Sequence, residues 1–474
     1  MTKGNRLFEE KIGRRELIKL AGKTAAAGVL GCGLPSLIRG SETSRPNIIF
    51  ILGDNHNANT TGFAGHPFIK TPGMDRLARE GVVFEHTYNT TSLCSPSRAS
   101  ILTGLYAHHH GVKNNHTPWT GKSRTFLEHM SNSGYATAFI GKWHMPGEGL
   151  PDLSFLDLFV SYTYREGQGA YFDCPMIVNG KEVPSRKQYI TEEVNEYAFE
   201  FMQQQLEKPD DKRKPFCLYL SHRPGHPPYQ SPKGISGMYD EVDVKQVLPE
   251  HADTMWYGKT RGNVFQGVMM GSYHDQYRRY CETLTAMDRD IEALLNRIDE
   301  LGLQDNTLVV YMGDNGMQWG THDRHGIREP YEPSARLPMV VRAPWLIKDP
   351  GSKREQLSLN IDIAPTLLDI AGVTIPKEMD GESLVPVLKS GHAKGRNSFL
   401  MEFWRYYPEN TPSYVGVRTK RYKYIEFEQG RKPWLFDLQD DPGEMNNLLG
   451  TPTGDELLPK MKRLLARLNN PASH

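Results

Sequence analysis

Short apolar runs alternate with longer amphipathic segments along most of the chain. The first run, residues 46–52, is rich in isoleucine and stops at Gly53 and Asp54, which is typical of a buried parallel strand. Later runs each follow a segment with helical periodicity. The predicted strands are 136–140, 216–220 and 307–312, and the predicted helices are 71–81, 125–133, 190–206 and 273–301. This order predicts an α/β fold in which a mostly parallel central sheet is sandwiched by helices.

The pattern changes near residue 390. Short aromatic-rich runs predict strands at 398–403, 414–418, 422–427 and 434–438. Leucines at helical spacing from Leu457 to Leu468 predict one closing amphipathic helix. We therefore predict a small C-terminal antiparallel sheet with one helix. The expected parts are a leader at 1–40, the main α/β domain at 41–390 and a C-terminal α+β subdomain at 391–474.

Composition excludes several classes of protein. The 474 residues carry 56 Lys+Arg and 56 Asp+Glu, and a general nucleic-acid binder would show a basic excess. No apolar run reaches 18 residues, which excludes a polytopic membrane protein. The five cysteines form no C-x-x-C pair, so neither a structural zinc site nor a disulfide framework is indicated.

The first 40 residues differ from the rest of the chain. They hold 8 basic and 3 acidic residues, and Arg14-Arg15 leads into an Ala/Gly-rich stretch that resembles a twin-arginine export signal. Residues 29–32 (VLGC) also resemble a lipoprotein processing site, in which Cys32 would be lipidated and would form the only membrane attachment. The alternative is a basic amphipathic helix on a cytosolic protein. We expect an exported protein, periplasmic or in the cell envelope, with a net charge near −5 after residue 40.

Polar clusters follow four of the predicted strands. They are Asp54-Asn55, Lys142-Trp143-His144, residues 222–227 (HRPGHP) and residues 313–316 (GDNG). Ligands of open parallel sheets bind outside the carboxyl ends of the strands, so the four clusters predict a single site.

Two kinds of side chain occur in these clusters. One kind offers only oxygen ligands, which suits a hard cation such as Ca²⁺ or Mg²⁺ and not zinc; these residues are Asp54, Asn55, Asp314 and Asn315. The other kind can hold an anion and move protons; these residues are Lys142, His144 and His226. Each histidine alone is more often a structural hydrogen-bonding residue, but their joint placement favours catalysis.

The segment Cys94-Ser-Pro96-Ser-Arg98 is the most specific candidate for a nucleophile. Pro96 fits a first helical position, which predicts that Cys94 lies just before a helix. Unpaired N–H groups and the positive end of the helix dipole favour anions there, and Arg98 can hold an oxyanion through two hydrogen bonds. The alternative is a buried structural cysteine.

These residues permit a comparison with a known family. The run from Cys94 to Gly104 (CSPSRASILTG) resembles the signature of the formylglycine-dependent type I sulfatases, which belong to the alkaline-phosphatase superfamily. The resemblance covers nearly the whole chain after the leader. Its other segments are 46–55, 71–84, 141–144, 226–228, 313–316, 331–338, 421–424, 435–438 and 441–444.

The resemblance implies a sulfatase mechanism. A formylglycine-generating maturation enzyme would oxidise Cys94, and the hydrated aldehyde would attack sulfur, expel the alcohol and then eliminate sulfate. Arg98 and Lys142 would hold the hydrate, His144 would take its proton in the elimination, and His226 would bind sulfate and assist the leaving oxygen. One calcium ion would be bound, and its ligands would be Asp54, Asn55, Asp314, Asn315 and the converted Cys94. Asp314 would also be placed to accept the proton of the nucleophile.

Three positions depart from the family pattern. Asn55 stands where a second aspartate is common, which removes one negative charge from the calcium site, and Arg223 stands where a lysine is frequent. His322 keeps its place, but the lysine that contacts sulfate in the family falls on Ile327. A cation about 4 Å from sulfate is worth on the order of 4 kcal/mol at an effective dielectric near 20, so we expect a replacement. Arg328 is the first candidate and Arg324 the second.

Several functions remain open at this stage. The first is hydrolysis of sulfate esters, with a sulfated carbohydrate as substrate or, alternatively, a small aryl sulfate. A phosphonate monoester or phosphodiester hydrolase with the same nucleophile is the second, and a degenerate glycan-binding protein is the third. Aromatic residues and histidines that could stack on sugar rings or belong to the core are His56, His116, Trp119, Trp319, His325 and Trp404.

Overall fold

The computed structural model describes residues 45–147, 152, 154–163, 168–254, 272–406, 411–428 and 430–469. The predicted leader and Cys32 therefore lie outside the described residues. Residues 44–474 cluster into one compact unit. Within the described ranges, no helix combines the length and apolar character that crossing a membrane requires.

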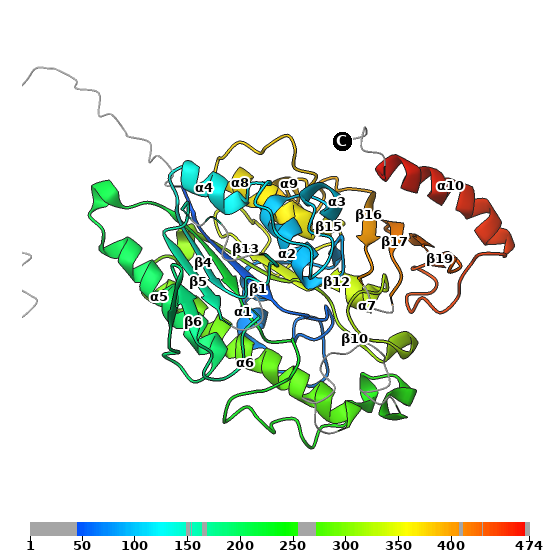
Figure 1. Ribbon diagram of the computed structural model, residues 1–474, viewed down its shortest axis with the longest axis horizontal. Coiled ribbons are helices and arrows are strands. Elements are labelled where there is room, and N and C mark those ends of the chain that lie inside the picture. The colour runs from blue at the N-terminus through cyan, green and yellow to red at the C-terminus, as the bar shows by residue number, and fades with distance from the viewer. Residues whose placement is uncertain are drawn as a thin grey trace, which may run out of the picture. The chain divides into compact units, whose positions relative to one another are not determined.

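A ten-stranded sheet forms the centre of this unit (Figure 1). Its order is β14-β2-β13-β9-β1-β8-β4-β5-β6-β7. The strands are β1 (Asn47–Gly53), β2 (Val82–Phe84), β4 (Ala136–Gly141), β5 (Leu158–Tyr162), β6 (Met176–Val178), β7 (Lys181–Val183), β8 (Phe216–Ser221), β9 (Thr307–Gly313), β13 (Met339–Arg342) and β14 (Lys353–Arg354). Strands β9, β1, β8, β4 and β5 run parallel, while β13, β6 and β7 pair antiparallel with their neighbours. The predicted mostly parallel sheet is confirmed.

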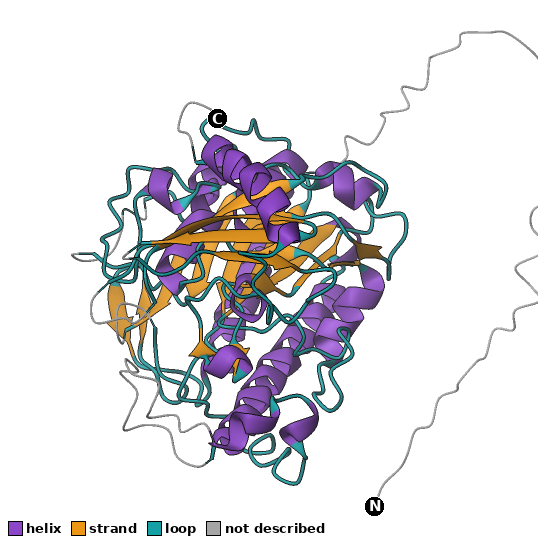
Figure 2. Ribbon diagram, turned by 90° about the vertical axis from the view of Figure 1, so that its right-hand side faces the viewer, coloured by secondary structure: helices purple, strands orange, loops and turns teal. Residues whose placement is uncertain are grey.

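Helices cover both faces of the sheet, as Figures 1 and 2 show. On one face α1 (Pro72–Glu80), α5 (Ile190–Glu207) and α6 (Tyr273–Glu300) bury apolar side chains with the inward residues of β1, β4 and β8. On the other face a second apolar cluster includes α2 (Cys94–Thr103), α4 (Phe126–Asn132), α8 (Ile363–Ile370) and α9 (Val385–Lys389). Because the central strands are buried on both faces, their sequences are continuously apolar rather than alternating.

A second, four-stranded antiparallel sheet lies at the C-terminal end of the unit. Its strands are β16 (Ser398–Phe403), β17 (Tyr414–Thr419), β18 (Tyr422–Phe427) and β19 (Trp434–Asp437), and α10 (Pro452–Leu468) packs against it through residues such as Met461 and Leu465. The predicted subdomain is confirmed in its elements. The predicted boundary at residue 390 stays a prediction.

Short elements complete the described chain. They are the strands β3 (Thr87–Tyr88), β10 (Gln318–Trp319), β11 (His325–Gly326), β12 (Arg336–Leu337) and β15 (Ser358–Leu359), the helices α3 (Ala107–His110) and α7 (Glu332–Ala335), and the 3-10 helices η1 (Asp210–Lys212), η2 (Val244–Gln246), η3 (Glu250–Thr254), η4 (Gln304–Asn306), η5 (Thr321–Asp323) and η6 (Asn360–Asp362).

A buried group of charges, Lys423, Arg418, Glu332 and Glu444, ties the C-terminal sheet to α7; we call it the brace. Lys423 on β18 is fully buried, and its Nζ donates to the carbonyl of Pro330 at 2.8 Å and lies 2.8 Å from Glu332 and 2.6 Å from Glu444. Arg418 on β17 donates to Glu332 at 3.1 Å. Glu332 begins α7 (Glu332–Ala335), so the brace ties the C-terminal sheet to this helix.

Candidate active site

The four polar clusters come together as predicted. Their strands are neighbours in the order β9-β1-β8-β4, and the register places Gly53 beside Gly313, and Gly141 beside Ser221. Each cluster starts directly after its strand, so all four meet at one edge of the sheet. The side chains of Asp54, Lys142, Arg98 and Asp314 are at most 2% exposed there.

Two buried ion pairs form the base of the site. Lys142 Nζ lies 2.5 Å from Asp54 Oδ2, and Arg98 donates from Nε to Asp314 Oδ2 at 2.9 Å. Arg98 also donates from Nη1 to the Lys142 carbonyl and to Ser221 Oγ, so its guanidinium is fixed in place. Burial and the charge of Asp54 raise the pKa of Asp314, while Arg98 and Lys142 oppose that rise. Two carboxylates this close remain ionised only with cations beside them.

Cys94 lies over these carboxylates. Its Sγ is 3.9 Å from Asn55 Oδ1, and Asn315 Nδ2 is 3.6 Å from Sγ. Burial raises the pKa of the thiol to about 12, so the unmodified residue is a neutral thiol and a poor nucleophile. The free thiol is thus not suited to catalysis at neutral pH.

The helix start differs from the prediction. Cys94 is the first residue of α2 and Leu93 precedes it as N-cap, so Pro96 is the third helical residue and not the first. The first four N–H groups of a helix have no partner within it, so a proline is tolerated there. Cys94 therefore lies within the first turn, where the helix dipole still favours negative charge.

The same residues fit a hard cation. One ligand atom from each of Asp54, Cys94 and Asp314 lies within 4.8 Å of the others, and all three residues are buried. Asp54 Oδ1 is buried without a hydrogen-bond partner, which is costly unless a cation binds it. Asn55 Oδ1 also faces Cys94, so the carboxylate and amide oxygens there suit Ca²⁺ or Mg²⁺. The predicted ligand Asn315 turns its Nδ2 toward Sγ, and its Oδ1 accepts from Asn89, so Asn315 as a ligand stays a prediction.

His144 has a strained backbone, with φ of 50°, and Ser95 Oγ donates to its carbonyl at 2.7 Å. The ring is buried, with Nδ1 unpartnered and Nε2 2.6 Å from Gln168 Nε2. Burial and the neighbouring positive charges, beginning with Lys142, hold the pKa of His144 well below its ordinary value. A neutral imidazole is the form that can accept a proton.

His226 and Arg223 leave the end of β8 together. His226 donates from Nδ1 to the Pro227 carbonyl at 2.6 Å, and burial with the charge of Lys142 holds its pKa well below the ordinary value. Arg223 is 3% exposed and donates to the Gln168 carbonyl at 2.6 Å and to the Pro227 carbonyl at 3.2 Å. Both groups are held by main-chain carbonyls, which fixes them before any ligand binds.

The third predicted group lies on the segment after β10. His322 has φ of 56° and stacks on Tyr331 at 3.7 Å, and burial lowers its pKa. Arg324 is exposed and lies 3.9 Å from Glu329, while Ile327 packs against the apolar clusters. Arg328 is half-buried with φ of 94°, and its carbonyl accepts from Tyr414. Arg328 as the replacement cation stays a prediction.

The aromatic candidates divide into three groups. In the first, His56 is fully buried and bonded to Tyr311 and to the Thr60 carbonyl, and buried Trp319 packs among tyrosines and against partly exposed His325. His56 and Trp319 therefore cannot line an open pocket.

The second aromatic group lies near Cys94. Asn115 Oδ1 accepts from the N–H of Ser95 at 3.0 Å, so the loop that carries His116 lies against the start of α2. His116 is exposed and stacks on exposed Tyr406 at 4.0 Å, and Lys113 lies 5.2 Å from the ring of half-buried Trp404. We call Lys113, His116, Trp404 and Tyr406 the rim.

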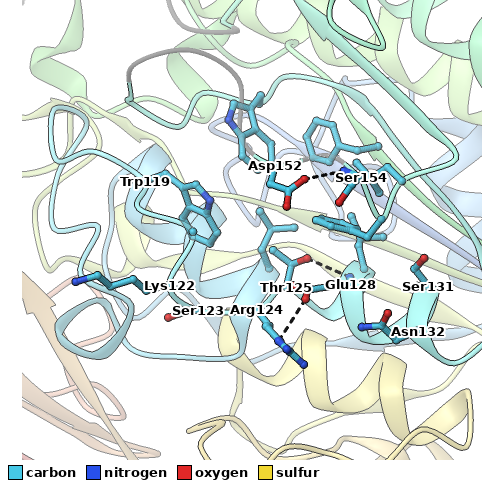
Figure 3. A pocket seen from close by; sticks show the side chains of 17 residues that line it. Trp119, Lys122, Ser123, Arg124, Thr125, Glu128, Ser131, Asn132, Asp152 and Ser154 are labelled. Atoms are coloured by element: carbon cyan, nitrogen blue, oxygen red, sulfur yellow. Dashed lines mark hydrogen bonds and ion pairs between the residues drawn. The ribbon is translucent and has the colours of Figure 1, made fainter.

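A separate hollow of about 510 Å³ lies beside α4, and its lining includes Trp119 and Trp143 (Figure 3). Three of its charged lining residues are paired: Arg124 with Glu128, and Asp152 with the N–H of Ser154. None of the predicted catalytic residues lines it. Trp119, a predicted wall residue, therefore lines this hollow.

Sequence reasoning missed Gln168 and Tyr171. Gln168 contacts His144 and Arg223, and Tyr171 donates to the His226 carbonyl at 2.5 Å and lies under Arg223. The segment follows no predicted strand and carries no charged motif, so the sequence offered no signal for it. Ser221, the last residue of β8, could have been found from its place next to the His222 cluster.

Comparison with known proteins decides the family. A model of the sulfatase family, described as "Sulfatase", matches residues 46–373, and one described as "N-sulphoglucosamine sulphohydrolase, C-terminal" matches residues 318–471. The chain belongs to the sulfatase family. It is therefore a sulfatase-family hydrolase of the alkaline-phosphatase superfamily, as the motif around Cys94 predicted.

Relatives cover nearly the whole sulfatase. An N-acetylglucosamine-6-O-sulfatase of Bacteroides thetaiotaomicron is 30% identical, over 94% of this chain and 88% of the relative. An ulvan-active sulfatase of Formosa agariphila is 31% identical, over 90% and 83%. A solved structure in complex with its substrate D-glucosamine-2-N,6-O-disulfate superposes with a TM-score of 0.79 at 28% identity, and the match covers 89% of this chain and 97% of that one.

Proposed function

We propose that this sulfatase removes sulfate from sulfated carbohydrates, with a formylglycine derived from Cys94 and one bound calcium ion. The observation that carries the proposal is the buried group of Asp54, Asp314 and Cys94, with Arg98 and Lys142 paired to the two carboxylates. Such a group combines a cation site, a residue to be converted and fixed positive charges within one site.

The sugar preference has two supports. The two relatives described above are named for an N-acetylglucosamine sulfate and for ulvan, and the solved relative holds a sulfated glucosamine. The rim adds aromatic rings and a lysine beside the start of α2. An aromatic face packs against the apolar face of a sugar ring, and a lysine attracts further sulfate or carboxylate groups on a glycan.

Formylglycine supplies, when hydrated, one hydroxyl that attacks sulfur and a second whose proton loss releases sulfate. Calcium, bound by Asp54, Asn55, Asp314 and Asn315, supplies positive charge that stabilises developing negative charge on oxygen. Both groups fit the residues present, because Cys94 is an inert buried thiol and Asp54 Oδ1 has no partner.

The chain's own residues bind the sulfate and move the protons. Arg98 and Lys142 are locked by Asp314 and Asp54, so their charges face the reaction without reorganising. His144 is neutral and accepts a proton. His226 is held at Nδ1 by the Pro227 carbonyl, and we assign it to the leaving oxygen: the negative charge of a bound sulfate ester favours the protonated imidazole that such donation requires.

The test begins with the chain co-expressed with a formylglycine-generating enzyme. Mass analysis of the Cys94 peptide should show conversion, and the protein should release sulfate from a panel of sulfated mono- and disaccharides with higher kcat/KM than from nitrophenyl sulfate or a phosphonate monoester. Cys94→Ala is the control and should be inactive. Unmodified Cys94 with no sulfate release would contradict the sulfatase proposal, and a preference for the aryl ester would contradict the sugar preference.

The rim can be tested separately. Trp404→Ala should raise KM for a sulfated sugar roughly 2- to 10-fold while leaving nitrophenyl sulfate hydrolysis nearly unchanged, because a stacking partner is worth about 0.5–1.5 kcal/mol. Equal losses on both substrates would indicate a structural role for Trp404.

We also propose export through the twin-arginine route, on the motif at Arg14-Arg15. Replacing both with lysine should retain the protein in the cytoplasm. A lipid on Cys32 would appear as palmitate labelling that Cys32→Ser removes, and cytoplasmic location of the unaltered chain would contradict both.

A further inference from the structure

The segment 168–171 contacts three of the predicted site residues. The Gln168 side chain meets His144, the Gln168 carbonyl accepts from Arg223, and Tyr171 donates to the His226 carbonyl and lies 4.8 Å below the Arg223 guanidinium. These three residues leave the ends of β4 and β8. One short segment thus fixes groups from two neighbouring strands.

Gly169 holds this segment in place. Its φ is +75°, and a Cβ added there would lie 2.6 Å from the ring of Tyr162 on β5. Only glycine accepts that conformation and that close approach without strain. The Gln168 side chain therefore starts from a backbone position that is packed directly against the sheet.

The hydrogen bond between Gln168 and His144 decides which ring nitrogen of His144 carries the proton. The two nitrogens, Gln168 Nε2 and His144 Nε2, lie 2.6 Å apart, while Gln168 Oε1 and His144 Nδ1 are buried without partners. Rotation by 180° about the last side-chain bond of Gln168 exchanges the positions of its amide nitrogen and oxygen. With the amide nitrogen facing the ring, His144 would carry its proton on Nδ1 and could not accept another there.

The opposite amide orientation makes His144 a base. Gln168 Oε1 then accepts the Nε2–H of His144, and the lone pair of Nδ1 is free. A proton taken from a hydroxyl breaks an O–H bond and forms the Nδ1–H bond, and the Nε2–H bond to Gln168 persists in the resulting imidazolium. No second rearrangement is needed before the proton passes to water.

We propose that Gln168 is a positioning residue of this sulfatase, whose amide oxygen holds the Nε2–H of His144 and thereby presents Nδ1 as the proton acceptor. The inference rests on the proposed role of His144 as a base. It adds a residue from a segment outside every motif of the site.

The surrounding charges explain why the partner is an amide. Lys142, Arg98, His226 and Arg223 all act on His144, and with burial they hold its pKa well below the ordinary value. A neutral amide fixes the tautomer without adding charge, so the ring stays neutral until it reacts. A carboxylate in the same place would favour the imidazolium and would also attract Arg223.

Two variants separate these effects. Gln168→Met keeps the length of the side chain and the carbonyl that binds Arg223 but removes the acceptor. It should lower kcat roughly 10- to 100-fold with little change in KM, the range found for residues that orient a functional histidine. Gln168→Glu keeps an acceptor and adds charge. It should retain most of kcat at high pH and shift the acidic limb of the kcat profile to higher pH.

Gln439→Met and Gln439→Glu are matched controls, because Gln439 is exposed on the turn after β19. Both should behave like the unaltered protein. A merely structural role for Gln168 would lower the thermal midpoint of both Gln168 variants and leave the pH profile of the folded fraction unchanged, and that outcome would overturn the proposal. A Gln168→Met protein as active as Gln439→Met would also overturn it.

The tautomer can be read without activity. In protein labelled with ¹⁵N-histidine, the signal missing from His144→Gln identifies His144, and we expect a protonated Nε2 and an unprotonated Nδ1 at neutral pH. Protonated Nδ1 would overturn the proposal. Failure of the sulfatase function itself would appear differently, as no sulfate release from the unaltered, formylglycine-containing protein.

Discussion

Two buried groups of charge, each with two acids and two bases, serve opposite purposes. In the brace every charge is satisfied: the Lys423 ammonium lies among the Pro330 carbonyl, Glu332 and Glu444, and Arg418 donates to Glu332. In the active site Lys142 and Arg98 pair with Asp54 and Asp314, but Asp54 Oδ1 has no partner and a neutral thiol lies nearby.

The difference teaches how to recognise a site among buried charges. A fully bonded group stabilises one conformation, and binding a ligand would require breaking it. A group with an unpartnered buried oxygen is costly until something binds, so the missing bond indicates where a ligand belongs. Burial alone does not distinguish the two groups.

Breaking the brace should have the largest effect on stability. Lys423→Met leaves Glu332 and Glu444 buried without their shared cation, which should lower the free energy of unfolding by about 3–5 kcal/mol, measured by urea denaturation. Lys353→Met is the control; its ion pair with Glu85 is exposed and is worth at most about 1 kcal/mol. Equal losses in the two variants would show that the buried brace stabilises the fold no more than an exposed ion pair does.

Breaking the active-site group should chiefly affect rate. Asp54→Asn removes the negative charge of the Asp54 carboxylate, whose Oδ1 has no partner. It should lower kcat roughly 10²- to 10³-fold, because a bound metal ion stabilises the transition state by several kcal/mol. Its urea midpoint should change less than that of Lys423→Met. Asp440→Asn, at an exposed pair with Arg421, should leave kcat unchanged.

Calcium should sharpen the comparison. At a concentration 100 times its Kd, calcium should stabilise the unaltered protein by about 2.7 kcal/mol, and chelation should remove this gain. Lys423→Met should keep the calcium-dependent shift in unfolding and Asp54→Asn should lose it. A shift retained in Asp54→Asn would place the ion elsewhere.

Substituting the two arginines after β10 tests which of them supplies the positive charge that the family lysine, here Ile327, would provide. Arg328→Ala should raise KM about 10-fold, equivalent to about 1.4 kcal/mol, if its guanidinium replaces the missing lysine at Ile327. Arg324→Ala should leave KM unchanged because Arg324 pairs with Glu329 at the surface. The reverse result would exchange their roles.

The smallest effect concerns a half-buried pair between α3 and β16. Burial lowers the pKa of His108, but the hydrogen bond and charge of Glu402 more than offset this, so its pKa is raised. The pair therefore stabilises the fold below the ordinary histidine pKa, and this contribution is lost as pH rises through the folded-state pKa. The free energy of unfolding of the unaltered protein should exceed that of His108→Gln at pH 5.5 by less than about 1 kcal/mol, and this excess should be smaller at pH 8.

Periodicity located the central strands β1, β4, β8 and β9 and the helices α1, α4, α5 and α6, because these strands are apolar on both faces and these helices each have one apolar face. Strands β2, β5, β6, β7 and β14 of the same sheet were not predicted, because their runs of two to five residues are too short. The predicted strand 136–140 is β4 (Ala136–Gly141), and the predicted helix 190–206 is α5 (Ile190–Glu207). Strand β13 was not predicted, since the run Met339–Arg342 is too short to stand out. Its antiparallel pairing with β9 follows from tertiary packing and not from local pattern.

The site was predictable where residues follow strands and was missed where they do not. Asp54, Lys142 and Asp314 were found because strand ends share one edge of the sheet. Gln168 contacts the same site from a segment with no periodic pattern, and its partners lie 24 and 55 residues away in sequence. Such contacts depend on how segments fold together, which a local pattern does not contain.

The burial of Cys94 sets an order of events during biosynthesis. Every residue of α2 is buried, and the strand that carries Asp314 is synthesised more than 200 residues after Cys94. A maturation enzyme has access to the thiol only while the later strands are missing or unpaired. If Cys94 is converted and the chain is exported folded, as proposed, oxidation would have to precede folding and folding would precede translocation, so slower folding would raise the fraction of converted enzyme.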